Sequence, residues 1–167
     1  MDLSLEQIPY RILPRLNAGC GSSDSKAPNQ INADLYPGPN VDLVFDIMQP
    51  WPFKDNSIGE VVSNHVLEHL PDPLPFFREA WRVLVERGTY NLQLRLPYGP
   101  SGAGFGDMAH IRYYVPGSFC GVQPGYDADV FNPQYRGWKT PFSVEAIYVR
   151  VNPRLNWLLK WPLRYIG

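Results

Sequence analysis

Proline and glycine occur throughout this chain, and they limit the length of any helix or strand that it can form. The 167 residues include 18 prolines and 14 glycines, which interrupt regular hydrogen bonding or adopt turn conformations. Hydrophobic residues still make up 44% of the sequence, a share typical of a packed globular protein. Because no repeat or low-complexity linker divides the chain, we expect short elements packed into a single domain over residues 1–167.

Short segments bounded by turn residues predict several strands, of which residues 41–47 are rich in β-forming side chains and residues 90–96 alternate apolar and polar side chains. They are expected at residues 11–18, 30–35, 41–47, 58–63, 90–96 and 144–151. A helix is predicted after Asp72, which is a good N-cap, with Pro73 in the first helical position and Gly88 as the C-terminal stop. Its apolar positions recur at helical spacing and are Phe76, Phe77, Ala80, Trp81 and Leu84. This alternation of strands with turns and a helix predicts an α/β fold with a mainly parallel sheet.

Chemically useful residues directly follow several of the predicted strands. In parallel sheets, ligands bind beyond the carboxyl ends of the strands. The residues in such positions are 19–22, Asp34, 46–53 and 63–65.

Gly19 and Gly21 follow the first predicted strand and permit backbone conformations closed to other residues. Backbone N–H groups in such a turn can bind a carboxylate or a phosphate. A dinucleotide-binding motif would need a third glycine, a long helix and an acid about 20 residues further on. Asp24 occupies the glycine position, Pro28 interrupts the helix and Asp34 comes too early. NAD binding is therefore disfavoured, and a tight strand-to-loop turn without a ligand is the alternative.

Charge and cysteine content narrow the function classes. The formal net charge of −1 and the pI near 6.3 imply no field suited to nucleic acid, which is therefore not an expected partner. Two cysteines, Cys20 and Cys120, cannot form a disulfide framework, so a reducing, cytoplasmic location is expected. The first residues carry acids and no long apolar run, so we expect no signal peptide and no transmembrane segment.

Seven segments occur in a fixed order along the chain: LNAGCG, INAD, VDLVFDI, WPFKDNS, VVSNHVLEHLPDP, FFREAWRVL and HIRYYVPGSF. Together they resemble the class I S-adenosylmethionine (SAM)-dependent methyltransferases, especially the small type-11-like members with a Leu-Asn-x-Gly-Cys-Gly motif. The resemblance covers roughly residues 12–120. It implies a Rossmann-like methyltransferase sandwich that uses SAM as cofactor and releases S-adenosylhomocysteine (SAH).

The resemblance also implies roles for residues at the strand ends. Gly19 and Gly21 would lie beneath the methionine part of SAM, and Asp34 would accept hydrogen bonds from both ribose hydroxyls, since a carboxylate has two oxygens. Asp46 would lie near the adenine amine with Ile47 as an apolar wall, and residues 63–65 would flank the sulfonium and the acceptor. The implied cofactor-binding set is Asn17, Gly19, Cys20, Gly21, Asp34, Leu35, Asp46, Ile47, Ser63, Asn64 and His65.

Several features depart from the family pattern. Asn17 replaces an acid, so the methionine amino group lacks a charged partner, and Ser23 replaces a third glycine. The sequence VERG replaces a Lys-Pro-Gly-Gly turn, and the helix that precedes the first strand in the family, and often covers the cofactor or substrate, is absent or reduced to residues 3–8. The expected sandwich is therefore trimmed at its N-terminus and in its first helix.

Histidines are the candidate catalytic residues, because a base is needed wherever the acceptor must first lose a proton. His65 ends the fourth predicted strand, and His110 follows a glycine-rich stretch, residues 99–106, that is either a lid or a plain connection. His69 lies one turn beyond His65 and is expected to cap or pack. Glu68 is expected to be a structural or solvent-facing partner.

The sequence HVLEH also matches the zinc-hydrolase pattern H-x-x-E-H. Zinc would be held by His65 and His69, with Glu68 between them, on one face of a helix. Pro71 and Pro73 leave room for about one helical turn, so zinc hydrolysis is a remote alternative and no metal is expected.

A non-catalytic module that binds a partner is the other alternative. The absent or reduced helix before the first strand and the Asn17 substitution favour this alternative. The presence of Asp34, Asp46 and residues 63–65 at the strand ends opposes it, since an inactive site need not keep these ligand groups. If the chain is an enzyme, the expected acceptor is a small molecule or sugar, methylated on oxygen or nitrogen.

The C-terminal tail, residues 152–167, mixes tryptophan and leucine with basic residues. It is expected to pack against the sheet or against a second subunit of a homodimer, or else to touch a membrane surface.

Overall fold

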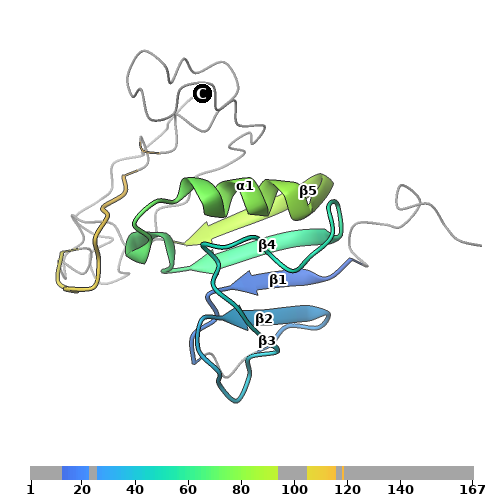
Figure 1. Cartoon of the computed structure of the whole chain (residues 1–167), viewed down its shortest axis with the longest axis horizontal. Coiled ribbons are helices and arrows are strands. Elements are labelled where there is room, and N and C mark those ends of the chain that lie inside the picture. The colour runs from blue at the N-terminus through green and yellow to red at the C-terminus, as the bar shows by residue number, and fades with distance from the viewer. Residues whose placement is uncertain (1–12, 23–25, 94–104, 116–117, 119–167) are drawn as a thin grey trace, which may run out of the picture. The chain divides into compact units, whose positions relative to one another are not determined.

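The computed structural model describes residues 13–22, 26–93, 105–115 and 118 (Figure 1). All of them belong to the compact unit Met1–Ser118, so a single domain over residues 1–167 stays a prediction. The expectations for residues 3–8, Ser23, Asp24, 94–104, Cys120, 144–151 and the C-terminal tail lie outside the described residues. No helix within the described part is long and apolar enough to cross a membrane.

Five strands form one parallel sheet with the order β3-β2-β1-β4-β5. They are β1 (Arg15–Ala18), β2 (Gln30–Asp34), β3 (Leu43–Val44), β4 (Ile58–Asn64) and β5 (Leu84–Gln93). β1 lies between β2 and β4, so the strand order reverses direction beside it. In such sheets the carboxyl ends on either side of the reversal bound the ligand crevice. The α/β fold with a mainly parallel sheet is confirmed.

β3 is much shorter than the strand expected at residues 41–47. The amide of Phe45 still donates to Asp34 O (3.0 Å), but the chain then turns at Asp46. The Asp46 side chain accepts a hydrogen bond from Met48 N (2.8 Å), and its carbonyl accepts one from Gln49 N (3.0 Å). An aspartate that bonds the backbone two residues ahead favours a turn over a continued strand.

The helix α1 (Leu74–Val83) covers one face of the sheet, across β4 and β5 (Figure 1). Asp72 Oδ1 accepts a hydrogen bond from Leu74 N (3.0 Å), so it serves the first turn although the cap position is Pro73. Of the apolar positions predicted to share its buried face, Phe76, Phe77 and Ala80 are buried, but Trp81 is 49% exposed.

The expected stop of this helix at Gly88 is wrong. The helix ends at Val83, and Leu84 already belongs to β5. The amides of Asn56 and Ser57 donate to the carbonyls of Arg82 (3.0 Å) and Val83 (2.8 Å), which satisfies acceptors that a helix end leaves open.

Gly88 instead lies where the pairing of β4 with β5 is irregular. Ile58 pairs with Leu84, whereas Glu60 pairs with Thr89, so β5 carries extra residues between these two positions. A Cβ atom on Gly88 would lie 2.8 Å from Val85 O. The glycine therefore allows a close backbone approach inside this bulge.

Aromatic side chains fill the space between α1 and the sheet. The Phe76 ring centroid lies 5.1 Å from that of Trp51 and 5.8 Å from that of Tyr90, which also contacts Phe77. The strand register places Val61 and Leu16 on the same face as Tyr90. Full burial of one such side chain contributes about 1.5–3 kcal/mol, so this face holds the main core of the described part.

Tyr90 also makes a polar contact in this core, because its hydroxyl lies 2.7 Å from Ser63 Oγ. Burial raises the pKa of the Tyr90 phenol above its ordinary 10.0, although the hydrogen bond to Ser63 lowers it in part. A pKa that is higher in the folded than in the unfolded state gives stability that is complete below pH 10.0 and is lost as the pH rises beyond it.

Tyr90→Phe is therefore expected to act in opposite ways at neutral and alkaline pH. At neutral pH the variant should lose about 1 kcal/mol, because buried Ser63 loses its partner. Above pH 10.0 the wild type should lose stability more steeply than the variant. Urea unfolding of both proteins across this range measures the difference, and equal alkaline losses would contradict the assignment.

The opposite face of the sheet carries a group of polar side chains on β1 and β2, next to buried Val62 of β4. Arg15 and Glu60 are register partners, and Arg15 Nε lies 3.4 Å from Glu60 Oε2. Asn17 and Asn32 are also register partners, and Asn17 Nδ2 donates a hydrogen bond to Asn32 Oδ1 (3.5 Å). Gln30 also donates to Asn32 (2.6 Å). Within the described residues α1 is the single α-helix and covers the other face. The connections from β1 to β2 and from β2 to β3 contain no described helical residue.

Candidate functional site

The turn after β1 joins the carboxyl ends of three strands. Gly19 and Gly21 have positive φ angles of 76° and 60°, which glycine adopts without strain. The amides of Gly19 (2.9 Å) and Cys20 (3.0 Å) both donate to Ala33 O on β2. A Cβ atom on Gly19 would lie 2.5 Å from a methyl group of Val66, just beyond β4. The turn is thus held between β2 and the segment after β4.

Asp34, the last residue of β2, is hydrogen-bonded directly to this turn. Its Oδ2 atom accepts from Gly21 N at 2.7 Å, and its Oδ1 atom accepts from Tyr36 N at 3.2 Å. The sequence predicted Asp34 and the glycines as separate ligand contacts and did not predict this bond between them. Each carboxylate oxygen has a second lone pair, so partly exposed Asp34 can still accept hydrogen bonds from ligand hydroxyls.

Asn17, two residues before Gly19, is buried, with 8% of its surface exposed. Its amide group donates to Asn32, but none of the described residues donates to its Oδ1 atom. An unsatisfied buried acceptor is costly, and an ammonium or hydroxyl donor from a ligand would satisfy it. This position fits a donor group beside the glycine turn.

Cys20, between the two glycines, is a poor nucleophile. Burial raises the pKa of its thiol, and the nearby Asp34 carboxylate raises it further. The thiol therefore stays protonated at neutral pH, and thiolate chemistry is disfavoured.

The segment after β3 forms the far side of the candidate site. Ile47 is buried, and its carbonyl accepts a hydrogen bond from Trp51 Nε1 (2.9 Å). Asp46 is fixed by its own turn, and Leu35, after β2, is half exposed. Apolar Ile47 and polar Asp46 therefore lie next to each other beyond β3.

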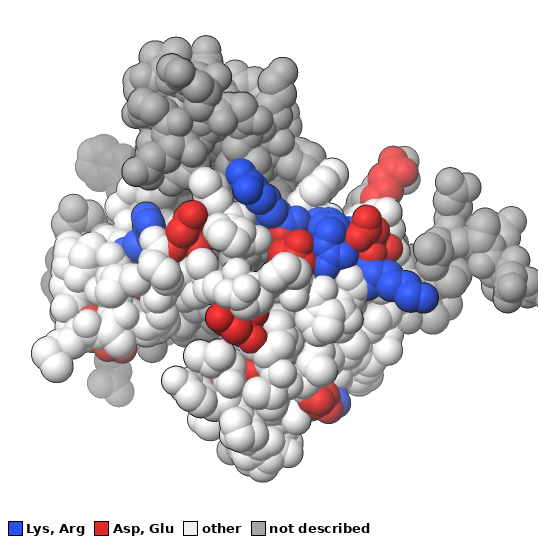
Figure 2. Space-filling model, viewed as in Figure 1, with Lys and Arg blue, Asp and Glu red and all other residues white. Residues whose placement is uncertain are grey.

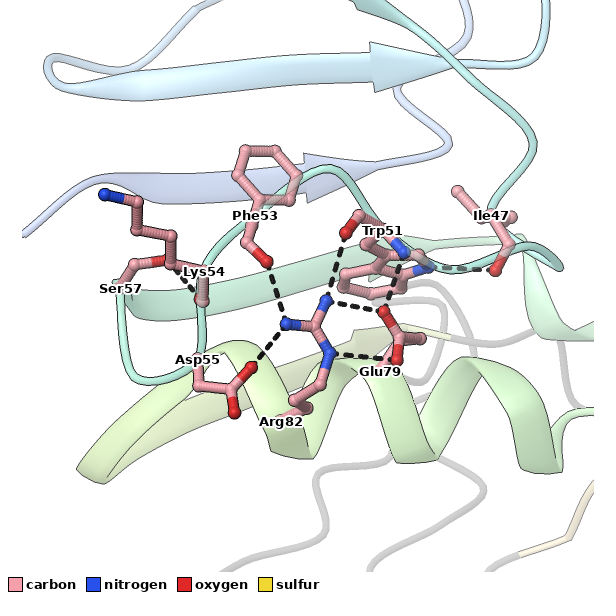
Figure 3. Close-up of polar contacts among 8 residues, drawn as sticks. All are labelled: Ile47, Trp51, Phe53, Lys54, Asp55, Ser57, Glu79 and Arg82. Carbon is pink, nitrogen blue, oxygen red and sulfur yellow. Dashed lines mark hydrogen bonds and ion pairs between the residues drawn. The ribbon is translucent and has the colours of Figure 1, made fainter.

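Arg82 on α1 fixes the connection between β3 and β4 (Figure 3). It donates two hydrogen bonds to Glu79 (3.0 and 2.7 Å) and one to Asp55 (2.7 Å). It also donates to the carbonyls of Phe53 (2.8 Å) and Trp51 (3.0 Å). These bonds lower the pKa of Glu79 and raise that of Arg82.

Glu79 completes the link to the site, because its Oε2 atom accepts from Trp51 N at 2.7 Å (Figure 3). Trp51 in turn holds Ile47. Arg82 was not among the predicted site residues. The one signal in the sequence was the spacing of Glu79 and Arg82, which favours an ion pair on a helix.

Ser63, Asn64 and His65 end β4 in three different environments. Ser63 is buried and bonded to Tyr90, whereas Asn64 is exposed. His65 has a positive φ angle of 56°, and its Nδ1 atom lies 3.3 Å from Glu68 Oε1. Glu68 is 1% exposed, so the solvent-facing alternative for this residue is wrong.

Glu68 belongs to the 3-10 helix η3 (Leu67–His69), whose one turn matches the room expected there. Its carbonyl accepts hydrogen bonds from Ile111 N (3.0 Å) and Arg112 N (3.1 Å). No group of three or more His, Cys, Asp or Glu within the described ranges is arranged to hold a metal ion.

His110 lies beside His69. The two ring centroids are 4.8 Å apart, and His69 Nδ1 lies 3.1 Å from Ala109 O. Arg112 donates to the carbonyls of Leu70 and Pro71. The structure therefore brings the second candidate histidine to η3, next to His69.

Residues 22–92 match the model of a family described as a methyltransferase domain. The match begins just after Gly21, so the glycine turn itself lies outside it. Among solved structures, the chain is similar to a SAM-dependent methyltransferase of Thermotoga maritima, described as a possible histamine N-methyltransferase. The identity is 15% and the TM-score 0.54, with 68% of this chain and 62% of that one covered.

The chain is also similar to the YcgJ protein of Bacillus subtilis, with 19% identity and a TM-score of 0.49 over 65% of this chain and 58% of that one. It thus spans about three fifths of the length of both structures. No curated protein matches the sequence. The likeness to the Thermotoga protein shows a Rossmann-like methyltransferase fold.

Proposed function

We propose that this chain is a SAM-dependent methyltransferase that transfers a methyl group to a small-molecule or sugar acceptor, on oxygen or nitrogen. The observation that carries the proposal is the bond between Gly21 and Asp34 (2.7 Å), where the carboxyl ends of β1 and β2 meet beside β4. This is the ligand position of an open parallel sheet. The match to a methyltransferase domain and the Rossmann-like methyltransferase fold support it.

SAM, when bound, supplies a methyl group on a positively charged sulfur. In our proposal the backbone of residues 19–21 lies beneath its methionine part, and Asn17 Oδ1 accepts a hydrogen bond from the methionine amino group. Asp34, with a lone pair left on each oxygen, binds the ribose hydroxyls. Asp46 and Ile47 bound the adenine, and residues 63–65 face the reacting groups.

Charge supports a small acceptor over nucleic acid. The formal net charge is −1, and Figure 2 shows acidic and basic side chains mixed on the face that carries α1. A single-sign basic surface is the usual mark of a nucleic-acid site. We propose a cytoplasmic location on the cysteine content, and a homodimer on the apolar content of residues 152–167.

Isothermal titration calorimetry of the full chain with SAH tests the proposal. Wild type should bind SAH. Asp34→Asn should weaken binding about 10–100-fold, because hydrogen bonds to a charged group contribute about 1.5–3 kcal/mol. If wild type gives neither binding heat nor a thermal shift with millimolar SAH or SAM, the proposal is wrong, and a non-catalytic module becomes the better interpretation.

Asp42→Asn is the matched control. Asp42 also accepts a hydrogen bond from a backbone amide, that of Asn32 (2.8 Å), but it precedes β3 and lies beside the middle of β2, two residues before Asp34. That bond and the one from Lys26 lower the pKa of Asp42. This variant should carry a comparable structural cost and leave SAH affinity within about twofold of wild type.

A further inference from the structure

His65 is held in an unusual backbone conformation at the end of β4. Its φ angle of 56° lies in the left-handed region, which a residue with a side chain adopts only when its surroundings enforce it. Such conformations cluster at functional sites. The His65 side chain is 31% exposed, so a molecule bound at the end of the sheet can reach it.

Glu68 lies against this imidazole from inside the protein. Its Oε1 atom is 3.3 Å from His65 Nδ1, and its side chain is 2% exposed. The backbone of Glu68 is fixed as well, because its carbonyl accepts hydrogen bonds from Ile111 N and Arg112 N. The carboxylate is therefore held in one place, out of water, next to one particular ring nitrogen.

This arrangement selects one form of the neutral imidazole. An ionised carboxylate only accepts hydrogen bonds, so the proton of neutral His65 must lie on Nδ1 for the contact to be favourable. The lone pair is then on Nε2. In a histidine, the hydrogen bond made by one ring nitrogen determines which of the two nitrogens carries the proton, and therefore which one can act as a base.

The location of the pair connects it to the proposed reaction. Val66, the residue after His65, has a methyl group against Gly19, where an added Cβ atom would meet it at 2.5 Å. His65 is thus one residue from a direct packing contact with the glycine turn. An imidazole there lies at the carboxyl ends of β1 and β4, on the side where the proposed methyl donor binds.

We propose that Glu68 is a positioning residue that holds His65 as the Nδ1–H tautomer, so that Nε2 takes the proton of a hydroxyl acceptor. This inference rests on the proposed function. The acceptor oxygen gains the methyl group, the sulfonium becomes a neutral thioether, and the hydroxyl proton moves to Nε2. A hydroxyl gains most from such a base, since a neutral amine already has a nucleophilic lone pair.

NMR of the full, 15N-labelled chain at about pH 8, where an ordinary histidine is neutral, tests the inference directly. The ring nitrogens of His65 are assigned by their loss in His65→Gln, and those of His69 and His110 in the corresponding variants. Wild-type His65 should show a protonated Nδ1 and an unprotonated Nε2. The opposite tautomer in the wild type would overturn the inference without any further variant.

Glu68→Gln adds a second readout. Unlike the carboxylate, the glutamine amide can donate to Nδ1 as well as accept from it, so the Nε2–H tautomer of His65 should become populated, whereas exposed Glu86→Gln should leave the spectrum of His65 unchanged. An unchanged tautomer in Glu68→Gln would contradict the positioning role.

SAH calorimetry separates this inference from the proposed function. Glu68→Gln should bind SAH within about twofold of wild type, because in our proposal Nε2 acts on the acceptor, whereas residues 19–21 and Asp34 bind the cofactor. Absence of SAH binding in the wild type overturns the proposed function. Wild-type SAH binding with an Nε2–H tautomer at His65 overturns the inference alone.

Discussion

Gly19→Ala is expected to destabilise the protein by about 2–5 kcal/mol, since it combines a left-handed conformation (about 1–2 kcal/mol) with overpacking (about 1–3 kcal/mol). Its φ angle is 76°, and the new Cβ atom would lie 2.5 Å from one methyl carbon of Val66 and 3.2 Å from the other. The Val66 side chain is buried, so it cannot rotate away into solvent. Urea unfolding monitored by circular dichroism measures the change.

Gly21→Ala separates the two causes, because Gly21 shares the positive φ angle (60°) but a Cβ atom added there would have no neighbouring atom within 4 Å. This variant should lose about 1–2 kcal/mol, the cost of the left-handed conformation alone. In a double-mutant cycle, Val66→Ala should recover part of the loss in Gly19→Ala. Equal losses in Gly19→Ala and Gly21→Ala would mean that the contact with Val66 does not constrain the turn.

Arg82→Met is expected to cost about 2–4 kcal/mol and to weaken SAH binding. Methionine keeps the aliphatic stem but removes five hydrogen bonds. Glu79 then loses its cation, and the carbonyls of Trp51 and Phe53 lose a donor, which is the costly way to break a polar network. Trp51 donates a hydrogen bond to Ile47 O, so a shift of Trp51 should also displace Ile47, which lies on the adenine side of the proposed cofactor site.

The stability difference between wild type and Arg82→Met should depend on pH in the acid range. The hydrogen bonds from Arg82 lower the pKa of Glu79 below its ordinary 4.5, so their contribution is complete above pH 4.5 and disappears as the pH falls through the folded-state value. The difference between wild type and Arg82→Met should therefore shrink in acid. Arg78→Met, an exposed change one turn earlier on α1, should stay within about 0.5 kcal/mol of wild type at every pH. A constant difference down to the acid transition would contradict the role of the Glu79 pair.

The sheet was predictable because its strands carry a local signal. Turn residues flank both residues 30–34 and residues 58–62, and the second run contains the β-branched residues Ile58, Val61 and Val62. β2 and β4 begin at the residues expected. The end of α1 was not predictable in this way. Leu84 and Val85 fit a helix and a strand equally well, and the amides of Asn56 and Ser57 that take the last helical carbonyls come from a distant part of the chain.

The candidate site was predictable in its positions but not in its bonds. Gly19, Gly21 and Asp34 could be found from their places after strands. The hydrogen bond between Gly21 and Asp34 depends on the register of β1 with β2. Arg82 could be recognised only as a partner of Glu79 in sequence, because its carbonyl partners lie 29 and 31 residues away.

The short connections between β1, β2 and β3 affect the order in which the sheet can assemble. Asn17 of β1 meets Asn32 of β2 after only 15 residues, and Asn32 meets Asp42 after 10. Arg15 pairs with both Gln30 and Glu60, and its path to Glu60 is roughly three times longer. Closing the longer loop costs about 1 kcal/mol more in chain entropy. Parallel pairing is usually slow because its contacts are distant in sequence, and in this chain β1, β2 and β3 avoid much of that cost.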